Sequence, residues 1–435
     1  MELARATFQG KFQQHHDAVL RFVHKENDNT NGPPLLHLHQ REALVAIYER
    51  LHTPGRRIAL VCLPPGTGKT DIAVLTPYML NSTRTLVLAP SPVIARQIYE
   101  AFTGSNAFWA ATVTGDATLT GAPMLVARGL VPQAVFQAYK PDVPEPTATN
   151  AVEVVMRPNE LIITTVSRLT RTPEMRQQLA AIDRNKFDLV IVDEAHHYPA
   201  EMWRCVCDHF ANRVVFLTAT KMHHDGYILG SAISLPDDDN PPVYEQSIEW
   251  AVDKGYIRGA TFHEFGDPGK MGAHGAKAGE SEVETLVRLV RAALVRHDLH
   301  HPGIVHKAMI LSHRVADTNE VTEAFNRLAP VECASYTSNT PNKDAVLEQF
   351  KANDTNPRVL SVCGSLLEGF DHKPVSVLGI YRNVGRERKV LFTQWIGRAI
   401  RKVPGEPEEG FTAEIIVHRD RHQRASFEEL FVVAD

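Results

Sequence analysis

A short apolar run that ends in a glycine turn and a Lys-Thr pair constrains this chain more than any other feature. The run is Ile58–Cys62, and it is followed by Pro65, Gly66, Thr67, Gly68, Lys69 and Thr70. A strand, a turn and the start of a helix in this order direct backbone N–H groups at phosphates. We therefore predict a phosphate-binding loop, in which Lys69 reaches the β- and γ-phosphates and Thr70 holds Mg²⁺. The usual pattern has glycine where this chain has Leu63. An ordinary turn is the alternative.

Length and composition narrow the classes of protein that this chain can be. Its 435 residues suggest two to three domains, and no apolar run approaches the roughly 18 residues of a membrane span. The formal net charge of −5 means that a nucleic-acid partner would need a local groove. The five cysteines are scattered and odd in number, which favours a reducing compartment. We expect an intracellular protein, cytoplasmic or nuclear, with a mitochondrial location not excluded.

Apolar segments and helical patterns alternate along most of the chain. Strands that are apolar on both faces and separated by helices predict a parallel sheet covered on both sides, hence an α/β fold. The alternation stops at 104–157, where we predict an exposed loop, and at 236–280, where we predict a linker. The predicted parts are therefore an N-terminal extension 1–33, a first domain 34–235, the linker 236–280 and a second domain 281–435.

Asp193 and Glu194 follow the apolar run Leu189–Val192. A carboxylate at the end of a buried strand points into the crevice where open α/β sheets bind ligands. We predict that Asp193 holds Mg²⁺ opposite Thr70 and that Glu194 orients and deprotonates an attacking water. An acidic helix cap is the alternative for this pair.

Four motifs in order resemble the signature series of superfamily 2 helicases and translocases. They are the phosphate loop, Asp193 to His196, Thr218 to Thr220 and Gln394 to Arg401. The run Asp193 to His197, with Glu368 to Asp371 later in the chain, makes the chain similar to the DNA-directed branch that includes type III restriction subunits. The resemblance implies two RecA-like domains, ATP hydrolysis with Mg²⁺ in the cleft between them, and DNA as partner.

The resemblance also assigns roles to single residues. It implies that Gln40 reads adenine, that Gly369 and Asp371 touch ATP and nucleic acid, and that Thr218 and Thr220 couple hydrolysis to nucleic-acid binding. Strand-end residues would contact the nucleic-acid backbone: Pro90, Ser91, Thr164, Thr165, Ser312 and His313. Buried strand ends with no such contact are the alternative.

Gln394, Arg398 and Arg401 fall at i, i+4 and i+7 of a helix predicted over 389–401, hence on one face. Such a face could aim two guanidinium groups at a γ-phosphate bound by the other domain, where arginine stabilises transition-state charge. An exposed basic helix face is the alternative.

Two positions depart from the family pattern. Lys221 stands where proline is usual, and Cys363 stands where many relatives have threonine. The few residues after Arg401 leave open a nucleotide-switched clamp that does not unwind nucleic acid. An RNA helicase is a further alternative, and we expect a monomer.

Overall fold

The computed structural model divides the chain into two compact units, the first made of Met1–Leu63 and Gly68–Glu245 and the second mainly of Gln246–Asp435. It describes residues 36–103, 161–198, 200–210, 212–220, 242–266, 279–328, 332–352, 356–363, 372–381, 389–403 and 411–431, with the single positions 16, 20, 23, 229, 277, 370 and 406. The predicted extension 1–33, apart from three of these positions, lies outside the described residues, as do the predicted loop 104–157 and Lys221.

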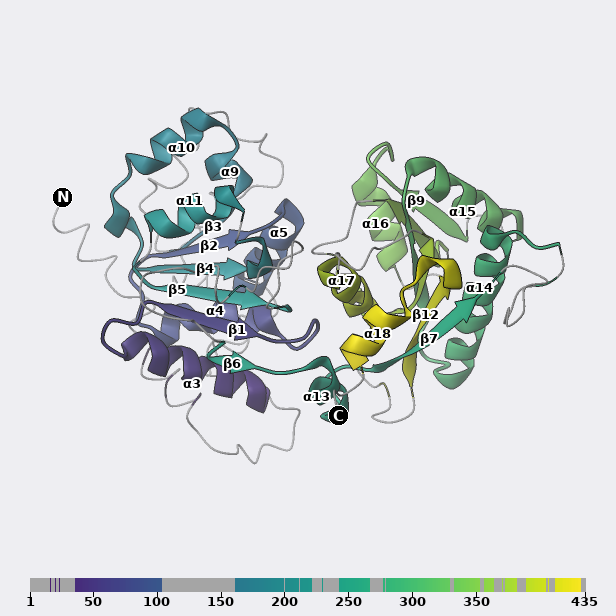
Figure 1. The fold of residues 1–435 in the computed structure, drawn as a ribbon, viewed down its shortest axis with the longest axis horizontal. Helices are drawn as coiled ribbons and strands as arrows, with labels where there is room; N and C mark the ends of the chain where they lie inside the picture. Colours follow the sequence, from purple (N-terminus) through teal and green to yellow (C-terminus); the bar gives the residue numbers. More distant parts are fainter. Residues whose placement is uncertain are drawn as a thin grey trace. The chain divides into compact units, whose positions relative to one another are not determined.

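The first unit alternates strands and helices as the sequence predicts (Figure 1). Its described strands are β1 (Ile58–Cys62), β2 (Thr85–Ala89), β3 (Leu161–Thr165), β4 (Leu189–Asp193), β5 (Val214–Thr218) and β6 (Tyr244–Glu245). Its described α-helices are α3 (Leu38–His52), α4 (Lys69–Met79), α5 (Pro92–Thr103), α9 (Ser167–Thr170), α10 (Pro173–Ala180) and α11 (Glu201–His209).

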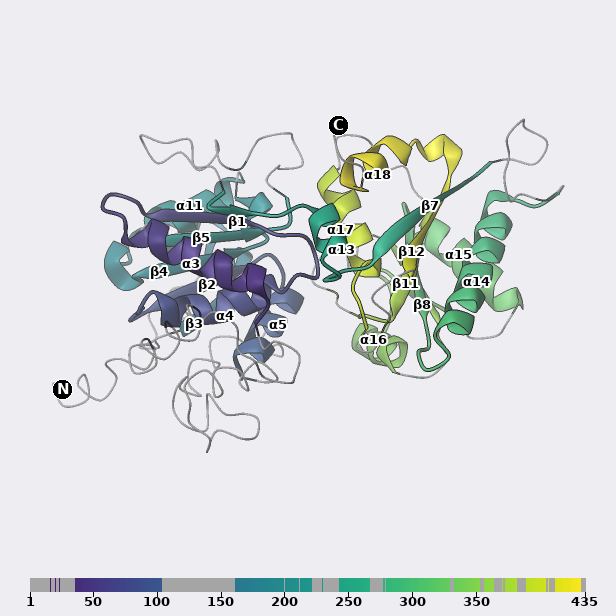
Figure 2. The same ribbon diagram turned by 90° about the horizontal axis from the view of Figure 1, so that it is seen from below.

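The six strands of this sheet are all parallel, in the order β3-β2-β4-β5-β1-β6. Alternate side chains enter two different cores: Ala59 and Val61 pack with α3, α4 and α5, whereas Leu60 packs with α9, α10 and α11. Figures 1 and 2 show these two sets of helices on opposite faces of the sheet. Because the strands are parallel, their carboxyl ends lie at one edge, where open α/β sheets bind ligands.

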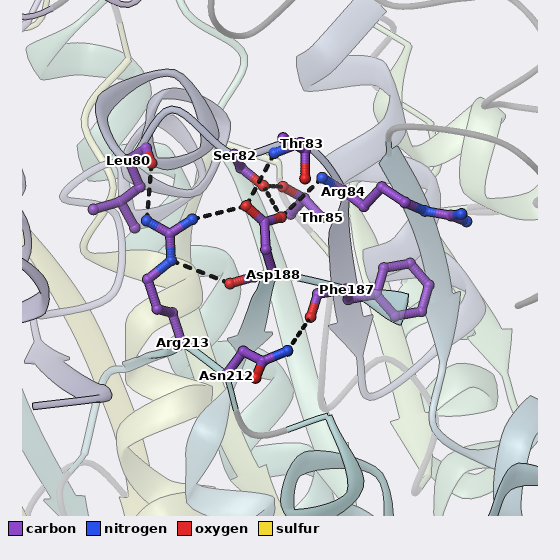
Figure 3. Close-up of polar contacts among 9 residues, drawn as sticks. All are labelled: Leu80, Ser82, Thr83, Arg84, Thr85, Phe187, Asp188, Asn212 and Arg213. Carbon is purple, nitrogen blue, oxygen red and sulfur yellow. Dashed lines mark hydrogen bonds and ion pairs between the residues drawn. The ribbon is translucent and has the colours of Figure 1, made fainter. Parts of the chain in front are cut away.

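A polar network at the opposite edge fastens the turn between α4 and β2 (Figure 3). Its centre is the carboxylate of Asp188, one residue before β4. This carboxylate accepts hydrogen bonds from Ser82 Oγ (2.7 Å), Thr83 N (3.0 Å) and Arg84 N (2.8 Å), and it pairs with Arg213 Nη2 at 2.8 Å. One carboxylate thus holds the end of α4 against the starts of β4 and β5.

The second unit has the same type of architecture (Figure 1). Its described strands are β7 (Gly259–Phe265), β8 (Lys307–Ser312), β9 (Cys333–Tyr336), β10 (Val359–Cys363), β11 (Val375–Tyr381) and β12 (Thr412–His418). Its described α-helices are α13 (Ile248–Asp253), α14 (Glu282–His300), α15 (Val315–Leu328), α16 (Lys343–Lys351), α17 (Lys389–Ala399) and α18 (Arg424–Phe431).

This second sheet is also parallel throughout, in the order β7-β12-β11-β8-β10-β9. Helices α14 and α15 cover one face, and α13, α16, α17 and α18 contribute to the core on the other. Helix α14 begins at a capping box in which Glu284 N donates to Ser281 Oγ (3.2 Å) and Ser281 N donates to Glu284 Oε2 (2.9 Å). The α/β fold with two parallel sheets is therefore confirmed.

The region 236–280, predicted as a linker, contains three elements of these units. Strand β6 extends the first sheet, α13 packs in the second unit, and β7 pairs with β12 over seven residues from Gly259 to Phe265. The alternating burial of β7 is that of an edge strand, whose polar positions hide it from a search for apolar runs.

Candidate functional site

The turn between β1 and α4 has the backbone shape that its glycines allow. Gly66 and Gly68 adopt φ values of +84° and +83°, a left-handed region that favours glycine, and Gly68 caps the N-terminus of α4. Thr67 Oγ1 donates to Pro64 O (2.7 Å), which closes the turn. The predicted loop therefore occupies the position from which a helix N-terminus binds anions.

Lys69 and Thr70 are the first two residues of α4. Lys69 Nζ donates to Leu63 O at 3.0 Å, so the ammonium group lies over the loop that it is predicted to serve. Leu63 N in turn donates to Thr218 O (3.0 Å), which continues the β1–β5 pairing past the last residue of β1. The loop is thereby joined to the end of β5.

Asp193 ends β4 and lies opposite Leu217 of β5, at the same sheet edge as the loop. The side chain is buried, and burial raises the pKa of Asp193 to about 7; the charge of Glu194 adds to the rise and Lys69 opposes it. The positive charge of Lys69 does not offset the burial of this carboxylate, so a bound cation would stabilise its charged form. The site therefore fits a cation bound by Asp193, with Thr70 as the second predicted ligand.

Glu194 has φ +52° and ψ +51°, a left-handed conformation that is uncommon outside glycine. Strained backbone of this kind persists only where the surrounding structure holds it, and it is frequent at active sites. Glu194 therefore follows Asp193, the last residue of β4, in a backbone conformation that the surrounding structure must hold.

His196 connects Glu194 to the end of β5, a contact that the sequence did not predict. Its Nδ1 lies 3.5 Å from Glu194 Oε2 and 3.4 Å from Thr218 Oγ1. Thr218 Oγ1 donates to Thr220 O (2.8 Å) and accepts from Thr220 N (3.2 Å). A chain of polar contacts therefore runs from Glu194 to Thr218 and Thr220, the residues that the resemblance names as coupling residues. A buried histidine within a carboxylate motif was the available signal.

The predicted backbone-contacting residues of the first unit lie at neighbouring strand ends, because Ala89 of β2 pairs with Thr165 of β3. Pro90 and Ser91 follow β2, and Ser91 Oγ accepts from Ile94 N (3.3 Å) at the start of α5. The side chains of Thr164 and Thr165 are buried, and Thr165 Oγ1 shares a hydrogen bond with Ser167 Oγ (3.1 Å).

In the second unit, Ser312 is buried at the end of β8 and His313 is exposed directly after it. Cys363 ends the adjacent strand β10, opposite Ser312, and its thiol lies 3.2 Å from His313 O. Gly369 and Asp371 lie outside the described residues.

Gln394 and Arg398 lie on α17, and Arg398 donates to Phe370 O. The predicted helix was too long, because α17 ends at Ala399 and Arg401 forms an antiparallel bridge with Ile257. The hydrogen bond from Arg258 N to Ile400 O (2.7 Å) occupies a carbonyl at this point. Arg401 therefore does not share a helical face with Gln394 and Arg398.

Residues 34–223 match the family model of the type III restriction enzyme res subunit. This segment, less than half of the chain, therefore carries a domain that is similar to the res subunit of type III restriction enzymes. No curated protein sequence matches this chain significantly.

Several solved structures share its fold. A fragment described as an HsdR subunit of a type I restriction enzyme from Vibrio vulnificus is 16% identical, with a TM-score of 0.59 over 97% of this chain and 69% of its own. S. cerevisiae Dbp5 bound to RNA and ADP BeF3 is 14% identical, with a TM-score of 0.51 over 92% and 93%. The type ISP restriction-modification enzyme LlaBIII bound to DNA is 14% identical, with a TM-score of 0.54 over 90% and 28%. At these identities the likeness concerns the fold, and it confirms two RecA-like domains.

Within the described part of the chain, no group of three or more His, Cys, Asp or Glu side chains could hold a metal ion. Mg²⁺ does not need such a group, since it is commonly bound by one or two carboxylates together with waters and phosphates. None of the described helices is long and apolar enough to span a membrane.

Proposed function

We propose that this protein is an ATP-dependent helicase or translocase that acts on DNA. The observation that supports this most directly is the placement of Lys69, Asp193 and Glu194 at one edge of the first sheet, within the segment that matches the restriction-enzyme family model. A cationic group, a buried carboxylate and a second carboxylate at the mouth of a phosphate loop are the parts that ATP hydrolysis needs.

We assign the nucleotide site to Gln40, Pro65, Gly66, Thr67, Gly68, Lys69 and Thr70, with Gly369 and Asp371 from the second domain. Lys69 would bind the β- and γ-phosphates, and Thr70 with Asp193 would hold Mg²⁺, which offsets the phosphate charge when it is bound. Glu194 would orient the attacking water and accept its proton. His196 would connect the Glu194 carboxylate to Thr218 and, through it, to Thr220.

We propose that Gln394, Arg398 and Arg401 of the second domain complete this site. A catalytic set divided between two domains, 34–235 and 281–435, makes hydrolysis depend on their closure. Nucleic acid that is bound across both domains would then control closure, and each ATP cycle would move the protein along a strand. Arg401→Ala should abolish turnover and spare nucleotide binding.

DNA is the proposed partner because the matched family is that of a restriction subunit and because one structural neighbour is bound to DNA. Another neighbour is bound to RNA, so RNA is the competing partner. Backbone N–H groups and hydroxyls at Pro90, Ser91, Thr164, Thr165, Ser312 and His313 would contact phosphates, which positions a strand without reading its sequence. The burial of Thr164 and Thr165 leaves mainly backbone groups for this contact.

The test is the ATPase rate of the full chain with single- and double-stranded DNA and RNA at stated salt, because phosphate contacts are salt-dependent. We expect stimulation by DNA and loss of turnover in Lys69→Ala and Glu194→Gln. Full activity of Glu194→Gln would refute its role as the base. Stimulation by RNA alone would assign the RNA-directed activity, and stimulation without displacement of a tailed duplex would assign translocation or clamping.

A further inference from the structure

The side-chain amide of Gln40 is bound to the phosphate loop. Gln40 Nε2 donates to Gly68 O (3.0 Å) and to Asp71 Oδ2 (2.9 Å), and Gln40 Oε1 accepts from His37 N (2.8 Å). These contacts use both amide hydrogens, since a primary amide has two. The Gln40 side chain is only 1% exposed. The amide therefore has no hydrogen left to donate to a nucleobase in this conformation.

Gly68 is the point on which these contacts converge. Its carbonyl accepts from Gln40 Nε2 and also from Asp71 N (3.0 Å), so both of its lone pairs are used. A Cβ at Gly68 would lie 2.0 Å from Gln40 Nε2 and 2.9 Å from Asp71 Oδ2. The left-handed turn before Lys69 thus packs directly against the Gln40–Asp71 pair.

The position of Asp71 adds an electrostatic reason for this arrangement. It lies in the first turn of α4, where the helix dipole favours a negative charge. A carboxylate at that point competes with phosphate for the same field. The hydrogen bond from Gln40 Nε2 connects one oxygen of this carboxylate to α3.

We propose that Gln40 and Asp71 form a latch that holds Gly68 and Lys69 in the shape that receives phosphates. In this proposal Gln40 acts on the nucleotide through the phosphate loop rather than by reading adenine, and Asp71 is a positioning residue. The inference rests on the proposed nucleotide site and adds Asp71 to it. Since the latch acts on the loop, its loss weakens binding of any polyphosphate, with or without a base.

The test compares the binding of ATP and of inorganic tripolyphosphate to the full chain by titration calorimetry. In Gln40→Ala and in Asp71→Ala, we expect the affinity for both ligands to fall about tenfold, the equivalent of one buried hydrogen bond. The double variant should lose no more than either single variant, because both break one latch. In ATPase assays, KM should rise while kcat stays within about twofold of the wild-type value.

Asp71→Asn is the matched control, because its amide oxygen still accepts from Gln40 while the negative charge is gone. It should bind both ligands at least as well as wild type. A loss of ATP affinity in Gln40→Ala with unchanged tripolyphosphate affinity would overturn the proposal in favour of base reading. Additive losses in the double variant would also overturn it.

Amide hydrogen exchange of nucleotide-free protein separates this proposal from the proposed function. In peptides that span 64–71, exchange should be faster in Gln40→Ala and Asp71→Ala than in wild type, with Asp71→Asn unchanged. Equal exchange in all four proteins would refute the latch. Wild-type protein that binds neither ATP nor tripolyphosphate would refute the proposed function and leave this readout intact.

Discussion

Replacing Asp188 by alanine should destabilise the first unit by about 3 kcal/mol. The carboxylate is the acceptor for a hydroxyl of Ser82, for the backbone N–H groups of Thr83 and Arg84, and for the guanidinium of Arg213 (Figure 3). Truncation leaves these four donors without that acceptor. Buried or half-buried donors that lose a charged acceptor cost on the order of 1–3 kcal/mol each.

Two features keep the predicted loss of stability in Asp188→Ala below the sum of four such losses. The Asp188 side chain is 31% exposed, so water can replace part of the lost contact. Arg213 also keeps its hydrogen bonds to Leu80 O (2.9 Å) and to the backbone carbonyl of Asp188 (3.1 Å). About 3 kcal/mol corresponds to a fall in Tm of roughly 6–12 °C for a unit of this size.

Scanning calorimetry of the full chain measures this change. Asp188→Asn should lower the free energy of unfolding by about half as much, roughly 1.5 kcal/mol. Its amide oxygen still accepts hydrogen bonds, whereas its NH₂ group cannot accept from the remaining donors. Glu49→Ala, at an exposed position of α3, is the control and should change stability by less than about 0.5 kcal/mol. A loss below about 1 kcal/mol in Asp188→Ala would show that the network does not stabilise the unit and would refute the reasoning.

Three further predictions concern other parts of the molecule. Gly68→Ala should abolish nucleotide binding, and adding Gln40→Ala should not restore it, because φ +83° remains strained for alanine; calorimetric titration decides. Glu406→Gln should lower the stability of the second unit by about 3–5 kcal/mol in urea unfolding, because Arg258 Nη2 pairs with Glu406 Oε2 at 2.8 Å and both side chains are fully buried; an unchanged midpoint would contradict this. Burial lowers the pKa of His306 to about 3, against 6.5 in the unfolded chain, so the neutral ring stabilises the fold above pH 6.5 and this stability is lost as the pH falls towards 3. The slope should reach at most about 1.4 kcal/mol per pH unit, and His306→Phe should flatten the profile below about pH 6.5, where the unfolded histidine takes up its proton.

Local patterns were sufficient to predict the continuously apolar strands such as β1 and the turn before α4, but not the short strand β9 (Cys333–Tyr336). Strand β1 is apolar at every position, and all five of its residues are buried. Neighbouring residues alone predict the structure of this segment. A continuous apolar run favours a strand that is buried on both faces, and Gly66 and Gly68 favour a left-handed turn after it. The position of Asp193 was also predictable from its neighbours, because it follows an apolar run and therefore lies at the carboxyl end of a buried strand.

Other parts were wrong or missed because their partners are distant in the sequence. Strand β7 looks like a linker until β12 supplies its hydrogen bonds, about 150 residues later along the chain. The helix predicted to reach Arg401 stops at Ala399, where Ile257 and Arg258 pair with the chain instead. Helical periodicity alone cannot show this competition.

The proposed nucleotide site shows the same difference between what the sequence predicts and what the tertiary structure adds. The sequence by itself predicted that the glycine turn before Lys69 and the carboxylates Asp193 and Glu194 lie at one edge of a parallel sheet, since each is marked by residues adjacent in the chain. Only the tertiary structure decided that His196 joins Glu194 to Thr218 and that Gln40 is bound to Gly68 and Asp71, 28 and 31 residues away. The physical reason is that the hydrogen-bond partners of a buried polar side chain depend on packing between elements, which no local pattern specifies.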